Sequence, residues 1–185
     1  MKKTMILATV IAILAGAWTV AVLNIGKVGD VPFLLWPTFI AWGAFFYAGA
    51  TVDGAVKAIV QFATGIVLAA VAAYVYTQLK PTDPNFVILG IFVFALAWPI
   101  TALSGVASLK GYWAAVPAGF MGAAVFFGVF FYGGTMGAKV DVPQAAIAAI
   151  LPLAAGLVLG WLSLQVTNVL AADKPVATAP APRAA

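Results

Sequence analysis

A long uncharged stretch near the end of the chain decides the fold. It reads PQAAIAAILPLAAGLVLGWLSLQVTNVL from Pro143 to Leu170. A helix needs about 20 apolar residues to cross the hydrocarbon of a bilayer, and this stretch is longer. No Asp, Glu, Lys or Arg interrupts it. The stretch therefore predicts a transmembrane helix.

Similar stretches recur through the rest of the chain, separated by short segments rich in Gly, Pro, Asp and Lys. We predict an all-α, polytopic membrane bundle with six transmembrane helices at residues 5–24, 31–51, 55–79, 86–107, 112–134 and 143–170. The first apolar run continues well beyond the roughly 7 to 15 residues of a signal-peptide core, so we interpret it as an uncleaved helix. Residues 171–185 are rich in Ala and Pro, and we expect them to form a disordered cytoplasmic tail.

The composition excludes several classes of function. Of the 185 residues, 65% are hydrophobic and 8% are charged, and the chain has no Cys, His or Glu. A chain this apolar needs the lipid bilayer as its solvent. Without Cys, His and Glu, no common metal site and no nucleophile with an adjacent base is available. We therefore expect no enzyme activity, no cofactor and no metal.

The distribution of positive charge predicts the orientation. With six helices, one side of the membrane holds Lys2, Lys3, Lys57, Lys110, Lys174 and Arg183, and the other holds Lys27, Lys80 and Lys139. Because short positively charged loops stay in the cytoplasm, this bias places both termini there. The bias also explains the net charge of +4, so no nucleic-acid partner is needed.

The sequence suggests an internal repeat at an offset of 80 residues. At this offset Trp18 aligns with Trp98, Pro37 with Pro117 and Phe46 with Phe126. A chain rich in Ala and Phe also gives chance matches, so coincidence is the alternative. A repeat unit of three helices would make the second half inverted relative to the first, as in many transporters.

Small residues and prolines mark further features of the spans. Gly119, Ala123, Gly156 and Gly160 lie at four-residue spacing, which favours close helix packing either within the bundle or between subunits of a homo-oligomer. Pro99 and Pro152 lie inside predicted spans, where proline removes one backbone donor. We predict a helix kink at each of these two prolines.

Candidate pore-lining residues are aromatic or neutral and polar. They are Trp18, Tyr47, Trp98, Thr101 and Phe127. Ordinary packing is the alternative for the deep tryptophans. Asp53 and Lys57 are four residues apart and are predicted to form an ion pair, either at the membrane interface or as a guard at a pore mouth.

Several short motifs resemble a known family. They are LWPTF at residues 35–39, Phe46, GAVK at residues 54–57 and VPAGFMGA at residues 116–123. These resemble the YcdZ-like family of small bacterial inner-membrane proteins, a domain of unknown function, from about Ile6 to Leu170. The longer turn after the second helix and the Ala/Pro tail depart from it. The resemblance implies a bacterial inner-membrane location and a helical bundle, and it supplies no substrate and no catalytic residues.

Two functions remain open at this point. The first is a passive channel or facilitator for a small neutral solute such as urea or an amide, because no charge lies near the centre of a predicted span. Size and layout are also similar to small proton-gated urea and amide channels, although the acid-gating groups of His and Glu are missing. The alternative is a non-transporting structural or accessory subunit that binds other membrane helices.

Overall fold

The computed structural model describes residues 2–79, 85–106, 111–132 and 140–172. The helices are α1 (Lys2–Ile25), α2 (Leu35–Tyr47), α3 (Val52–Leu79), α4 (Val87–Ala102), α5 (Val116–Tyr132) and α6 (Val142–Ala171), with a 3-10 turn η2 (Leu103–Gly105) after α4. Strands β1 (Lys27–Val28) and β2 (Val31–Pro32) pair antiparallel in a short hairpin. Within the described residues the predicted all-α bundle of six helices is confirmed. Most of the predicted tail lies outside these residues.

Four of the helices, α1, α3, α4 with η2, and α6, are long and apolar enough to cross a membrane. Helices α2 and α5 are shorter than predicted, with 13 and 17 residues. At about 1.5 Å per residue, α2 covers about 20 Å, less than the roughly 30 Å of a hydrocarbon core. The prediction of 31–51 for this span is corrected because Val31 and Pro32 pair in the hairpin, and Gly49 and Ala50 take positive φ angles after the helix.

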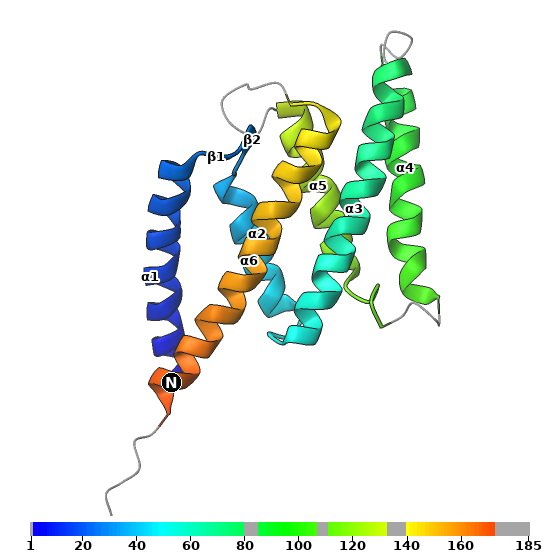
Figure 1. Ribbon diagram of the computed structural model, residues 1–185. Coiled ribbons are helices and arrows are strands. Elements are labelled where there is room, and N and C mark those ends of the chain that lie inside the picture. The colour runs from blue at the N-terminus through cyan, green and yellow to red at the C-terminus, as the bar shows by residue number, and fades with distance from the viewer. Residues whose placement is uncertain (1, 80–84, 107–110, 133–139, 173–185) are drawn as a thin grey trace, which may run out of the picture.

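The helices alternate in direction along the chain (Figure 1). The start of α1 and the end of α6 lie at the same end of the bundle, the lower end in Figure 1. The hairpin β1–β2 lies at the upper end. An even number of crossings thus places the beginning of α1 and the end of α6 together, as the charge distribution predicts.

The two halves of the chain make equivalent contacts. Helix α2 packs on α6 as α5 packs on α3, and α1 packs on α6 as α4 packs on α3. Because each half has three alternating helices, the second half runs in the opposite direction to the first (Figure 1). This exchange of partners agrees with a 3+3 inverted repeat.

Two glycines, Gly65 and Gly156, make equivalent close contacts in the two helix pairs. A Cβ built on Gly65 of α3 would lie 1.9 Å from the Gly119 carbonyl oxygen and 2.9 Å from the Ala123 nitrogen of α5. A Cβ built on Gly156 of α6 would lie 2.1 Å from the Thr38 oxygen and 2.9 Å from the Trp42 nitrogen of α2. The long helix of each half therefore carries a glycine that packs directly on one backbone turn of the short helix of the other half. Gly119 follows Thr38 by 81 positions, one more than the 80-residue offset of the sequence comparison.

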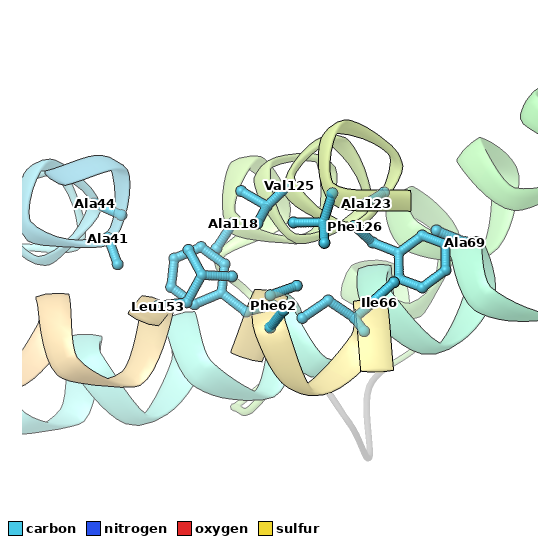
Figure 2. Packing of buried hydrophobic residues seen from close by; sticks show 14 of the residues in the cluster. Ala41, Ala44, Phe62, Ile66, Ala69, Ala118, Ala123, Val125, Phe126 and Leu153 are labelled. Carbon is cyan, nitrogen blue, oxygen red and sulfur yellow. The ribbon is translucent and has the colours of Figure 1, made fainter. Parts of the chain in front are cut away.

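The core lies between α2, α3, α5 and α6. Phe62, Phe126 and Leu153 are fully buried, and alanines such as Ala41 and Ala123 let the helices approach (Figure 2). Helices α1 and α4 contribute little to this core, with two buried residues each. They form the two edges of the bundle in Figure 1.

Candidate functional site

One polar cluster of the interior joins α3, α4 and the segment before α5. The fully buried Gln61 donates from Nε2 to the Trp113 carbonyl oxygen at 2.7 Å and, more weakly, to the Ile100 oxygen at 3.5 Å. The Trp113 indole donates to the Thr64 hydroxyl at 3.0 Å. Gln61 Oε1 is buried without a hydrogen-bond partner. It lies 2.7 Å from a Cβ built on Gly119, so only glycine leaves room for this amide.

A second polar cluster joins α2 and α6. The Trp42 indole lies 3.4 Å from the Ser163 hydroxyl, which itself donates to the Gly160 carbonyl at 2.7 Å. The Thr167 hydroxyl donates to the Ser163 carbonyl at 2.7 Å. Ser163 and Thr167 are fully buried. The polar groups of this cluster hydrogen-bond to one another or to the backbone of α6, and the Trp42–Ser163 contact joins α2 to α6. The cluster therefore leaves none of these three side chains free to bind a solute.

The five candidate pore-lining residues do not converge on one cavity. Tyr47 and Trp98 are 73% and 70% exposed on the outer surface, and Thr101 is exposed as well. Phe127 is half-buried and stacks on Phe131. Trp18 packs edge-on against Phe33 with 6.0 Å between ring centroids, and its indole N–H is buried without a partner. A lumen within one chain would require these residues to face one another.

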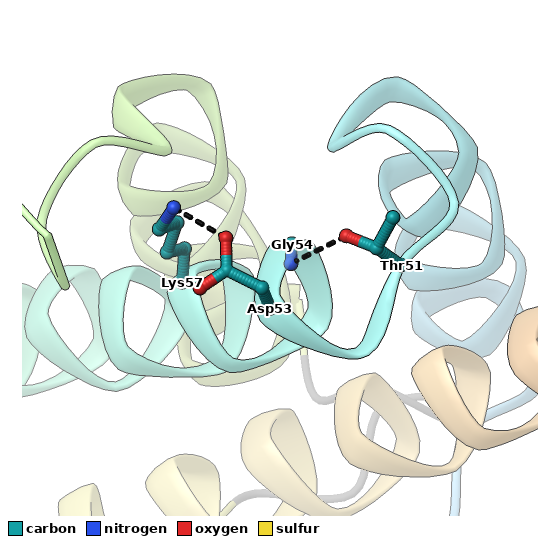
Figure 3. A network of polar contacts seen from close by, with 4 residues as sticks. All are labelled: Thr51, Asp53, Gly54 and Lys57. Carbon is teal, nitrogen blue, oxygen red and sulfur yellow. Dashed lines mark hydrogen bonds and ion pairs between the residues drawn. The ribbon is translucent and has the colours of Figure 1, made fainter.

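The predicted ion pair is present: Lys57 and Asp53 contact each other in the first turns of α3 (Figure 3). The Thr51 hydroxyl accepts from the Gly54 N–H and so caps the same helix start. Asp53 is exposed, whereas the Lys57 side chain is only 30% exposed. This pair lies at the end of the bundle where α1 begins, which fits an interfacial position.

A cavity of about 250 Å³ lies beside this ion pair. It is lined by Tyr47, Ala48, Gly54, Lys57, Ala114, Ala115 and Pro117. At the opposite end of the bundle, Gly128 corresponds to Ala48 at the 80-residue offset. There the Trp36 ring lies 3.2 Å from a Cβ built on Gly128. The two corresponding positions therefore have different surroundings: Ala48 borders a cavity, and Gly128 lies beside the Trp36 ring.

Other cavities lie along the sides of the helices and are apolar. One of them, about 460 Å³, lies between α3 and the end of α4 and includes Thr64, Pro99 and Trp113. Another, about 350 Å³, lies between the start of α1 and Leu170 of α6. Neither lies in the core between the four inner helices. Within the described ranges, no three His, Cys, Asp or Glu residues gather as a metal site would require.

The small residues chosen from sequence all serve packing within the chain. A Cβ on Gly160 would lie 2.7 Å from the Phe45 side chain, and Gly156 is covered by α2. Gly119 and Ala123 lie against α3. The expectation of a subunit interface through the Gly156 and Gly160 face is therefore corrected, because α2 of the same chain already occupies it.

Both internal prolines lie within continuous helices. Pro99 is inside α4 and Pro152 is inside α6, where it is buried. The kinks at these residues stay a prediction. Pro99 borders the groove beside α3.

Gln61, Thr64 and Trp113 were not among the site residues predicted from the sequence. The signal that would have selected Gln61 is its amide, which carries four hydrogen-bonding sites and must find partners within a spanning helix.

Comparison with known families identifies the chain. Residues 8–168 match the family described as protein of unknown function (DUF1097), so the chain belongs to that family. Membership confirms the expectation of a domain of unknown function, while the narrower YcdZ-like assignment stays a prediction. Neither the curated proteins nor the solved structures contain a significant match.

Proposed function

We propose that this protein is a non-transporting multi-pass membrane subunit that acts through contacts of its outer surface with other membrane helices. One observation carries the proposal: the space between the four inner helices is filled by apolar side chains, while Tyr47, Trp98 and Thr101 face outward. A solute path needs a continuous lumen with polar groups directed into it. The arrangement of these side chains supports a binding role for the outer helices.

The second candidate is the passive channel for a small neutral solute. The exchange of helix partners between the two halves favours it, because inverted repeats are a common architecture of transporters. The cavity beside Tyr47 and Lys57 also offers an entrance at one end. Against it, the Trp36 ring lies beside Gly128, the position that corresponds to Ala48 at the 80-residue offset.

We further propose a bacterial inner-membrane location with both termini in the cytoplasm, and a YcdZ-like identity within the family. The location and identity rest on the resemblance of the motifs at residues 35–39, 54–57 and 116–123. The orientation is supported by Lys2, Lys3 and Lys57 near one end of the bundle and Lys27 near the other. We propose no catalytic activity, since five Asp are the only acidic residues of a chain without Cys and His.

Reconstitution separates the two candidates. Purified full-length protein in liposomes is mixed rapidly with hyperosmotic urea or formamide, and the swelling phase is followed by light scattering. A non-transporting subunit leaves the swelling rate equal to that of protein-free liposomes, and ionic conductance stays at baseline. Swelling that is faster with the unaltered protein, and that returns to the protein-free rate with the Tyr47→Leu variant, would favour the channel instead.

A further inference from the structure

The cavity beside the Asp53–Lys57 pair is lined by a charged side chain, unlike the apolar cavities along the sides of the helices. The Lys57 side chain is only 30% exposed and lines this space of about 250 Å³. The other lysines of the described residues are exposed; they are Lys2, Lys3 and Lys27. Partial burial of an ammonium group is unfavourable unless acceptors surround it. An anionic group in the cavity would therefore be stabilised by Lys57.

The contact between Asp53 and Lys57 leaves both side chains with further hydrogen-bonding capacity. An ammonium group has three N–H donors, and a carboxylate has about four lone-pair sites. Within the described residues the two side chains contact each other and make no other hydrogen bond (Figure 3). The pair therefore offers a ligand two N–H donors of Lys57 beside the acceptor oxygens of Asp53.

The length of α3 places this pair at the level of the lipid headgroups. Helix α3 has 28 residues and so extends about 42 Å, which matches the roughly 40–45 Å of a bilayer with its headgroup regions. Lys57 follows Val52, the first residue of the helix, by five positions, so it lies about 8 Å from the helix start, near the boundary between headgroups and hydrocarbon. Asp53 lies one turn earlier, about 6 Å nearer to water.

Small residues and one tyrosine complete the lining of the cavity. Gly54, Ala114 and Ala115 add little bulk. Tyr47 also lines the cavity and is 73% exposed, so the space reaches the outer surface there, and the phenol can donate to a phosphate oxygen. The volume is below the roughly 300–1,000 Å³ of pockets that enclose a whole small molecule. It suits a headgroup whose acyl chains stay in the bilayer.

We propose that this cavity binds the headgroup of a zwitterionic phospholipid with a primary ammonium group, such as phosphatidylethanolamine. The lipid phosphate contacts the Lys57 ammonium. The lipid ammonium, the outermost group of such a lipid, donates to Asp53. The two charges of the headgroup thus match the protein pair in sign and in order of depth, whereas a headgroup with the phosphate charge alone is repelled by Asp53. Basic pockets between transmembrane helices are recognised sites for lipid headgroups.

Lipid titrations of the full chain test this assignment. Purified protein in detergent is titrated, by isothermal titration calorimetry, with short-chain phosphatidylethanolamine, phosphatidylcholine and phosphatidylglycerol, and with inorganic phosphate. We expect phosphatidylethanolamine to bind about tenfold more tightly than the other three, because it alone supplies both a phosphate and an N–H donor with positive charge. Equal dissociation constants for the three lipids would overturn the proposal. Inorganic phosphate that binds as tightly as phosphatidylethanolamine would overturn it in favour of a soluble anion.

Variants of the pair and of the cavity wall test the chemistry. Lys57→Gln should raise the dissociation constant for phosphatidylethanolamine about tenfold. Lys27→Gln changes an exposed lysine at the other end of the bundle and is the matched control, with little expected change. Asp53→Asn should remove the preference over phosphatidylglycerol, because the repelling carboxylate is gone.

Ala114→Leu fills the cavity without changing a charge, at an exposed position outside the helices. It should weaken phosphatidylethanolamine binding as Lys57→Gln does. Unchanged dissociation constants for both Lys57→Gln and Ala114→Leu, or an equal loss for Lys27→Gln, would refute the site.

This inference goes beyond the proposed function and does not depend on it. Lipid titrations without a preference would overturn the headgroup site and leave the non-transporting role intact. Liposomes that swell quickly in urea would overturn that role whatever the lipid preference.

Discussion

Gln61 shows what a single polar residue does inside this bundle. Its amide holds the end of α4 and the segment before α5 against α3, although it is separated from Ile100 and Trp113 by 39 and 52 positions in sequence. In a medium without water, the Gln61 amide gains two backbone oxygens as acceptors for its N–H groups. The residue therefore fixes the relative position of three elements that apolar contacts alone would specify loosely.

Replacing Gln61 by Leu should destabilise the fold by about 1–3 kcal/mol, because the Trp113 and Ile100 carbonyl oxygens lose their donor while staying buried. The free energy of unfolding in mixed micelles, from titration with a denaturing detergent, measures the loss. Gln78→Leu, on the exposed side of the same helix, is the control and should cost little. Equal losses for the two variants would contradict a specific role for the Gln61 amide.

Glycine substitutions offer a test with opposite expected signs. Gly65→Ala and Gly156→Ala should each cost about 1–3 kcal/mol or more, since the added methyl group meets a backbone oxygen at about 2 Å. Gly43→Ala should instead stabilise α2 by up to about 1 kcal/mol, because nothing lies within 4 Å of its Cβ. Detergent unfolding compares all three. A destabilised Gly43→Ala, or a neutral Gly156→Ala, would contradict the close helix crossings.

At the scale of the elements, the two short helices α2 and α5 lie in the core. Helix α2 packs on the long helix α6, and α5 packs on the long helix α3. Their glycine contacts are equivalent in the two halves. Each short helix is flanked by non-helical segments, and for α2 these are the β1–β2 hairpin before it and the turn after it.

Sequence alone predicted the number of helices, the ion pair and the close-packing role of Gly156 and Gly160, because these depend on local spacing. It did not predict which helix covers each glycine, and it left open that Gly160 packs against a second subunit. It also placed Tyr47 and Trp98 in a lumen, since an apolar helix in lipid carries no polar face to distinguish inside from outside. Helix partners are set by shape complementarity between distant segments, which a single sequence does not display.

The direction of the elements, together with the proposed cytoplasmic location of both termini, predicts which side of the membrane each turn faces. Asp53 and Asp30 are exposed and lie at opposite ends of the bundle. In the single variants Asp53→Cys and Asp30→Cys, an impermeant maleimide applied to intact cells should label only Asp30→Cys. Labelling of Asp53→Cys requires opened membranes. Labelling of both from outside, or of neither after opening, would contradict the alternating path of the helices.

At the scale of the whole molecule, two inverted halves meet across a filled interior. The residues at this meeting are mostly apolar, and the buried polar side chains of Gln61 and Ser163 donate to backbone oxygens. Inverted repeats alone do not require a lumen, because the same symmetry also serves to build a compact bundle. The absence of ionisable groups from the cores of the described helices leaves the outer helices as the surfaces available for recognition.

The most direct test of this account asks whether water reaches the centre of the bundle. Single cysteines replace Ala41, Ala123 and Ala149, which are 0–4% exposed on three different helices, and Tyr47→Cys beside the cavity is the positive control. A small charged thiosulfonate reagent reacts only where water ionises the thiol. With the protein in liposomes, the account predicts rapid modification at position 47 and none at the three interior positions. Modification of all three interior cysteines at rates near that of the control would establish a water-filled path and contradict the filled interior.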